Sequence, residues 1–187
     1  MSLKAKGLFA LYMILVFLTA IGEGESPQPP CTVTLVPGQS IWYAIKRASP
    51  GDVICLGPGT WRENLIIKKS LTIRGSGSDR TTIDGSANPG RPVILIDSNS
   101  EIKVTIEELR IIGAVSYSKN RLCIIESPLW ICPLGIDVRG RARAVIQGNN
   151  ISGNDGSGIF IWSRAIIRNN IIKGCLLYTS PSPRDRG

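Results

Sequence analysis

The feature that most constrains the fold of this chain is a repeat with a period of about twenty residues. Short alternating apolar runs, polar turns and a closing glycine recur in the segments 93–113, 135–153 and 158–174. The tripeptide NNI at 149–151 returns as NNI at 169–171. A unit this short cannot bury its own apolar side, so successive units must stack on one another.

The alternation within each unit has a period of two, which assigns strands rather than helices. The strands are too short for a sandwich, and the leucine and helix spacing of leucine-rich repeats is missing. We therefore predict an all-β solenoid, a parallel β-helix, in which isoleucines such as Ile146 and Ile167 lie in register in a dry interior column. Asn150 and Asn170 are expected at the bend, where asparagine tolerates left-handed backbone angles.

The start of the repeat region favours the same fold. Ser40 can cap a short amphipathic helix at 41–48, which would cover the open strand edges of the first coil. The motifs PGD at 50–52, PGTWREN at 58–64 and KSLTIRG at 69–75 closely resemble the opening of pectin-lyase-like proteins. This resemblance implies a right-handed parallel β-helix solenoid with a short N-terminal capping helix. We expect it to be incomplete at the C-terminus.

The two ends of the chain differ from the middle. Lys4 and Lys6 precede an unbroken apolar run at 7–22, followed by polar, proline-rich residues, which is typical of a secretory signal peptide. A retained signal anchor is the alternative. Residues 175–185 resemble a translated sequencing-library adapter. We therefore predict four segments: a signal peptide at 1–22, a linker at 23–33, a truncated β-helix at 34–174 and a non-native, adapter-derived tail at 175–187.

An exported protein can form disulfide bonds between its cysteines. Outside the tail the chain has Cys31, Cys55, Cys123 and Cys132, and four cysteines permit two disulfides with three possible pairings. We favour a local bridge between Cys123 and Cys132. The predicted location is secreted, either extracellular or in the periplasm or at the cell surface, with no membrane association after signal cleavage.

Charge and composition exclude several classes of partner and site. The net charge of +8 is scattered along the chain, whereas a nucleic-acid binder concentrates Lys and Arg in a patch with aromatic residues. Only RGRAR at 139–143 gathers basic residues, and we interpret it as a solvated turn. The chain has no histidine, which excludes histidine zinc ligands and Ser-His-Asp triads. We predict no nucleic-acid partner, no cofactor and no metal.

The sequence does not identify catalytic residues. The adjacent aspartates of polygalacturonase-like hydrolases, the acidic calcium cluster of pectate lyases and the later aspartate motifs of pectin methylesterases are not found in this sequence. Glu107 and Glu108 are neighbours, so on a strand they point to opposite faces. Glu63 is expected to accept hydrogen bonds at a turn rather than to act in catalysis.

The best functional indication is a strip of outward-pointing side chains in two stacked coils. The alternation places Asp137 beside Phe160 and Arg139 beside Trp162. Exposed aromatic rings flanked by charge suit sugar rings, because the flat ring face meets C–H groups while charged groups bind hydroxyls or carboxylates. Trp61 is a further candidate for the same role. Packing beneath a loop or later coils is the alternative for each aromatic residue.

Taken together, these features predict a secreted or surface β-helix protein that binds or processes extracellular polysaccharide. If it is an enzyme, a polysaccharide lyase or glycoside hydrolase is the expected class. The alternative is a non-enzymatic structural or adhesin-like protein, or a periplasmic accessory β-helix protein. The substrate and the oligomeric state remain open.

Overall fold

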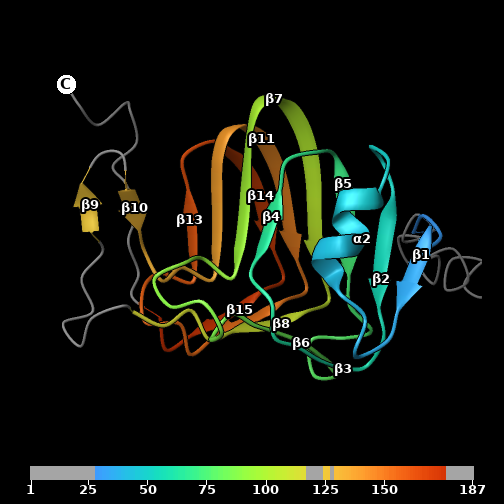
Figure 1. The fold of residues 1–187 in the computed structure, drawn as a ribbon, viewed down its shortest axis with the longest axis horizontal. Coiled ribbons are helices and arrows are strands. Elements are labelled where there is room, and N and C mark those ends of the chain that lie inside the picture. Colours follow the sequence, from blue (N-terminus) through green and yellow to red (C-terminus); the bar gives the residue numbers. More distant parts are fainter. Residues whose placement is uncertain (1–27, 117–123, 127–128, 176–187) are drawn as a thin grey trace, which may run out of the picture.

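The computed structural model describes residues 28–116, 124–126 and 129–175. It is a right-handed parallel β-helix whose strands form three faces along one axis (Figure 1), which confirms the predicted fold. The first face consists of β1 (Val33–Leu35), β2 (Val53–Leu56), β5 (Leu71–Arg74), the C-terminal halves of β7 (Ile94–Glu107) and β11 (Ile136–Gln147), and β14 (Arg164–Arg168).

The other two faces complete each coil. The second face consists of β3 (Gly59–Trp61), β6 (Thr81–Asp84), β8 (Arg110–Ile112), β12 (Asn150–Ser152) and β15 (Ile171–Lys173). The third face consists of β4 (Leu65–Ile67), the N-terminal halves of β7 and β11, and β13 (Ile159–Ile161). Outside the coils, β9 (Ile124–Glu126) and β10 (Leu129–Ile131) form an antiparallel hairpin. In Figure 1 this hairpin lies toward the end opposite helix α2 (Ile41–Arg47).

A single column of isoleucines runs through the interior behind the first face. Each member pairs in register with the next, in the order Ile54, Ile73, Ile106, Ile146 and Ile167. The first four are fully buried, and the last is 47% exposed because it belongs to the last coil that the structure describes. The predicted register of Ile146 over Ile167 is confirmed.

The corner between the third and first faces is a bend within one strand rather than a separate turn. Both β7 and β11 continue through it, with a register irregularity between Gly140 and Ala142. Gly140 has φ of 65°, and a Cβ built at this position would lie 2.3 Å from the carbonyl oxygen of Ser98. Any side chain here would clash with the backbone of the preceding coil, so the bend requires glycine.

The corner between the first and second faces holds an asparagine ladder, as predicted. In the coil that contains β11 and β12, however, the ladder residue is one position earlier than predicted. Asn149, not Asn150, stacks on Asn170: its Nδ2 donates to Asn170 Oδ1 at 3.0 Å. Asn150 is a strand residue paired with Ile171. The coils are offset by 21 residues at this corner, so aligning the two NNI tripeptides at an offset of twenty placed the register one residue out.

The residue before each ladder position makes the turn itself. Glu108, Gly148 and Asn169 precede Leu109, Asn149 and Asn170 and have φ of 58°, 65° and 56°. These are the left-handed angles expected for the bend. Asparagine does supply one of them, at Asn169, while glycine and glutamate supply the others.

Helix α2 covers the N-terminal end of the solenoid as predicted. The Ser40 side chain accepts a hydrogen bond from Tyr43 N at 3.2 Å, and Ile41 and Ile45 are buried against the core. Glu63 accepts three further hydrogen bonds at this end of the helix, from the Ser40 hydroxyl and the backbone N–H groups of Ile41 and Trp42. Its structural role is therefore that of a helix cap.

Cys31 and Cys55 form a disulfide bond that ties the N-terminal segment to β2. Cys123, half of the favoured second pairing, lies outside the described residues, as do the expected signal peptide at 1–22 and positions 176–187 of the expected tail. Across the residues that the structure describes, none of the helices has the length and apolar character that a membrane span needs.

Candidate functional site

The structure brings four of the five predicted site residues together on the third face. Asp137 pairs with Phe160 across β11 and β13, and the backbone of Trp162 donates to the carbonyl of Val138, which places Trp162 beside Arg139. We call these four residues the aromatic strip. Its register was predicted from the alternation of the two strands, and the strand pairing confirms it.

The two charged residues of the aromatic strip, Asp137 and Arg139, form an ion pair instead of presenting two separate charges to solvent. Asp137 is fully buried, and its Oδ2 lies 2.5 Å from Nη2 of Arg139. Burial raises the pKa of Asp137 above its ordinary value, and Asp97 in the adjacent coil adds to this rise. The Arg139 guanidinium opposes it. Asp137 was predicted to point outward beside Phe160 as a candidate for contacting sugar. It lies beside Phe160, but its side chain is covered, so it orients Arg139 instead of presenting a carboxylate to a ligand.

The aromatic half of the strip is more open. The rings of Phe160 and Trp162 pack edge to face with centroids 5.1 Å apart, and Trp162 is 51% exposed. Edge contact with Phe160 restrains the indole without covering it. Trp162 thus presents an oriented apolar surface on the coil next to Arg139.

Trp61 does not belong to this site. It lies on β3 of the second face, is 3% exposed and packs in the hydrophobic core. Its Nε1 donates to the carbonyl of Gln39 at 3.1 Å, so the indole is anchored beneath the segment that leads into α2. A buried ring cannot contact a polymer, which corrects the sequence-based assignment of this residue.

The buried carboxyl of Asp137 gives a pH-dependent prediction. A raised folded-state pKa means that the folded chain holds a proton that the unfolded chain has released. The contribution of Asp137 to stability therefore declines as the pH rises from about 4 toward its folded-state pKa. In thermal unfolding followed by circular dichroism, Asp137→Asn should lose this decline. Asp79→Asn, which removes an exposed carboxylate, is the control. An unchanged pH profile in Asp137→Asn would contradict the assignment.

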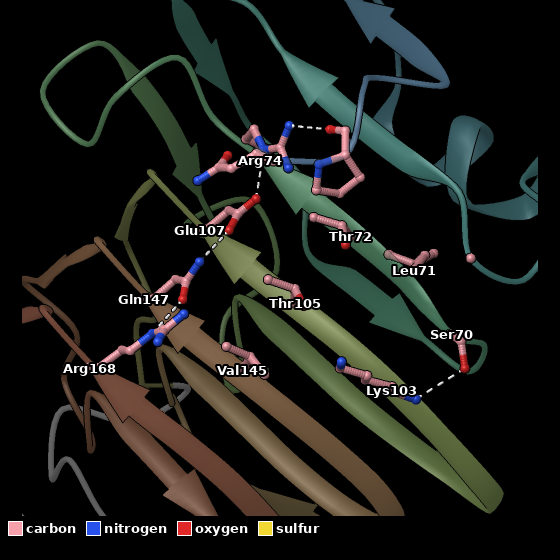
Figure 2. Close-up of a pocket in the computed structure, with 13 residues that line it drawn as sticks. Ser70, Leu71, Thr72, Arg74, Lys103, Thr105, Glu107, Val145, Gln147 and Arg168 are labelled. Atoms are coloured by element: carbon pink, nitrogen blue, oxygen red, sulfur yellow. Dashed lines mark hydrogen bonds and ion pairs between the residues drawn. The ribbon is translucent and has the colours of Figure 1, made fainter. Parts of the chain in front are cut away.

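A second site, on the outer side of the first face, was not predicted. A groove of about 510 Å³ crosses β5, β7, β11 and β14. Figure 2 shows a row of polar side chains that links four successive coils along it. Arg74 Nε and Gln147 Nε2 each lie 2.6 Å from a different oxygen of Glu107, and Arg168 Nε donates to Gln147 Oε1 at 2.7 Å. Glu107 is thereby buried and satisfied by its neighbours.

The sequence did contain the signal for this row. Residues two positions apart share a side of a strand, so each residue that follows a column isoleucine must point outward. Arg74, Glu107, Gln147 and Arg168 each follow one directly. The partners of Glu107 in this row, Arg74 and Gln147, lie 33 and 40 residues away along the chain.

In the described ranges no three His, Cys, Asp or Glu side chains lie close enough together to hold an ion. Asp155, in the loop after β12, accepts a hydrogen bond from Ser116 N at 2.9 Å, as a carboxylate in a turn commonly does.

Comparisons with known proteins support the fold. No protein-family model matches the chain, and no curated protein matches it in sequence. A pectin methylesterase mutant solved in complex with a hexasaccharide aligns with a TM-score of 0.57 at 17% identity, over 79% of this chain and 50% of that chain. A second pectin methylesterase complex, with another hexasaccharide, aligns with a TM-score of 0.53 at 17% identity, over 83% and 59%. The chain therefore spans half of the first structure and 59% of the second, and the likeness shows the fold alone.

Proposed function

We propose that this chain is an exported β-helix protein that binds extracellular polysaccharide at the aromatic strip. The observation that carries the proposal is the pairing of two oriented groups on adjacent coils. Trp162 is held by Phe160 and remains half exposed, and Arg139 is held by the buried Asp137.

These two groups supply complementary contacts to a sugar. An indole face attracts the apolar C–H side of a pyranose ring, and a guanidinium donates paired hydrogen bonds to hydroxyl or carboxylate oxygens. Both groups are fixed by neighbours before any ligand arrives. Little conformational entropy is then lost on binding, which favours affinity.

The solved structures add support of a general kind. Two pectin methylesterases of the same fold were solved with hexasaccharides bound. Those proteins show that a protein of this fold can bind a hexasaccharide. Polysaccharide is therefore the class of ligand to test first.

Export is part of the proposal. The basic and apolar pattern of residues 1–22 is typical of a secretory signal. The disulfide between Cys31 and Cys55 fits an oxidising compartment, because cytoplasmic thiols are kept reduced. Recovery of the chain from the medium or periplasm, shortened by the signal segment, would support this part. Retention of the full-length chain in the cytoplasm would contradict it.

Binding is proposed in preference to catalysis. General acid and base groups must reach the bond that they act on. In the aromatic strip the one carboxyl group, on Asp137, is buried against Arg139. Its position suits holding the arginine in place and not contacting a substrate.

Trp162→Ala is expected to weaken binding to the preferred polysaccharide about tenfold, because a stacked indole contributes on the order of 1.5 kcal/mol. The measurement is isothermal titration calorimetry, after a panel of neutral and acidic polysaccharides has been screened by affinity electrophoresis. Trp42→Ala is the matched control, since Trp42 is also 51% exposed but lies on α2. Equal affinities for the two variants would rule out the strip as the binding site.

A further inference from the structure

The outer side of the first face carries three parallel rows of side chains, one residue per coil. Each row follows from the strand register. The row nearest the corner with the third face is Ser70, Lys103, Arg143 and Arg164. The middle row is Thr72, Thr105, Val145 and Ile166. The third row is Arg74, Glu107, Gln147 and Arg168.

Cations in this surface exceed the carboxylates that neutralise them. Glu107 is matched to Arg74 by an ion pair, and Glu101 lies 3.3 Å from Arg143 in a largely exposed pair. No carboxylate of the described ranges pairs with the three remaining cations, which are Lys103, Arg164 and Arg168. Arg168 is oriented by a neutral amide, Gln147 Oε1. The outer side of the first face therefore carries unpaired positive charge, and two of these cations, Lys103 and Arg168, line the groove.

The geometry of the rows suits a chain that lies along the solenoid axis. Neighbouring coils are about 4.8 Å apart, and rows two residues apart on a strand are separated by about 6.6 Å. The two outer rows therefore lie about 13 Å apart, on either side of a floor of threonine, valine and isoleucine. A single extended polymer can rest on that floor with cations along both sides.

The composition of the groove discriminates between anionic polymers. Proteins that bind single-stranded nucleic acid stack the bases on aromatic side chains. None of the described residues that line this groove is aromatic. Thr72 and Thr105 offer hydroxyl groups instead, next to the apolar Val145 and Ile166. Hydroxyls, methyl groups and flanking cations match a sugar chain that carries acidic groups.

We infer that the groove on the first face binds a linear glycan bearing carboxylate or sulfate groups, at a site separate from the aromatic strip. This inference goes beyond the proposed function, because it adds a second, charge-selective binding face. Lys103 and Arg168 contact the acidic groups from the two sides of the groove, while the middle row supports the sugar rings. The interaction weakens as salt is added, since exposed charges are screened over about 10 Å.

The test compares Lys103→Gln/Arg168→Gln, which changes two cations that line the groove, with Arg91→Gln/Arg110→Gln in the full chain. The second variant removes the same charge from exposed residues outside the groove. The probes are a linear polyuronate, a sulfated dextran, an uncharged dextran and a single-stranded DNA, each titrated at low and high salt. The groove variant should bind the acidic glycans about tenfold more weakly, as two exposed ionic contacts of about 0.7 kcal/mol each are lost. The control variant should bind like the unmodified chain.

The outcomes distinguish a carboxylate ligand from a sulfate ligand, and binding at the groove from binding at the aromatic strip. Loss of polyuronate binding alone identifies a carboxylate ligand, and loss of sulfated dextran binding alone identifies a sulfate ligand. Equal weakening in both double variants would overturn the inference, because net charge would then explain the binding. Tighter binding of single-stranded DNA than of either glycan would also overturn it. Trp162→Ala should leave acidic-glycan binding at the groove intact, so the failure of one site is distinguishable from the failure of the other.

Discussion

Replacing Ile106 by alanine is expected to lower the free energy of unfolding by about 3 kcal/mol, within the range for large-to-small changes in a tight core. Ile106 is fully buried, with Ile73 on one side and Ile146 on the other in the interior column. Adjacent coils are fixed by backbone hydrogen bonds, so they cannot close over the missing methyl groups and a cavity remains. Urea denaturation of the full chain, followed by circular dichroism, measures the loss.

Thr105→Ala is the control for this prediction, since it shortens the neighbouring residue on the same strand. Thr105 points into the groove of the first face, so its loss should cost less than about 1 kcal/mol. A slip of one residue in the strand register would exchange the two side chains between core and surface. Similar costs for the two variants would therefore refute the stacking of isoleucines that organises the whole domain.

The column could be predicted from the sequence because its signal is repeated and unambiguous. Alternation assigns each isoleucine to the inner side, and burial of one side forces every coil into the same register. The ladder residue was harder to predict because Asn149 and Asn150 are adjacent, and each has an asparagine counterpart in the next coil. A one-residue difference in coil length decides between them, and pattern matching at a fixed period does not detect it.

The two surface sites show a different limit. Alternation gives the direction in which a side chain points, but not what covers it. It therefore placed Asp137 and Trp162 correctly on one strip and yet missed that Asp137 is buried. The third row of the groove was missed because its contacts join residues 33, 40 and 21 positions apart along the chain. Loops of unequal length between strands hide such stacks from any search for a constant period.

Asn149→Ala is expected to lower the free energy of unfolding by about 3 kcal/mol, because it removes hydrogen bonds to two backbone groups and to the Asn170 side chain at a buried corner. Asn149 Nδ2 donates to the carbonyl of Ile106 at 2.9 Å and to Asn170 Oδ1, and its own Oδ1 accepts from Leu109 N at 3.1 Å. Water cannot replace these contacts, since Asn149 is 1% exposed. Thermal and urea unfolding of the full chain give the loss.

Asn150→Ala is the matched control, because Asn150 is the first residue of the strand that follows the ladder. The Oδ1 atom of Asn150 is buried and makes no hydrogen bond within the described part of the chain, so its removal relieves a desolvated polar group rather than breaking a contact. The two variants delete the same side chain at adjacent positions, with the same change in helix and strand propensity. A large loss at Asn149 with little or none at Asn150 follows only if the coils are offset by 21 residues at this corner. The reverse result would restore the offset of twenty, and with it a ladder built on Asn150.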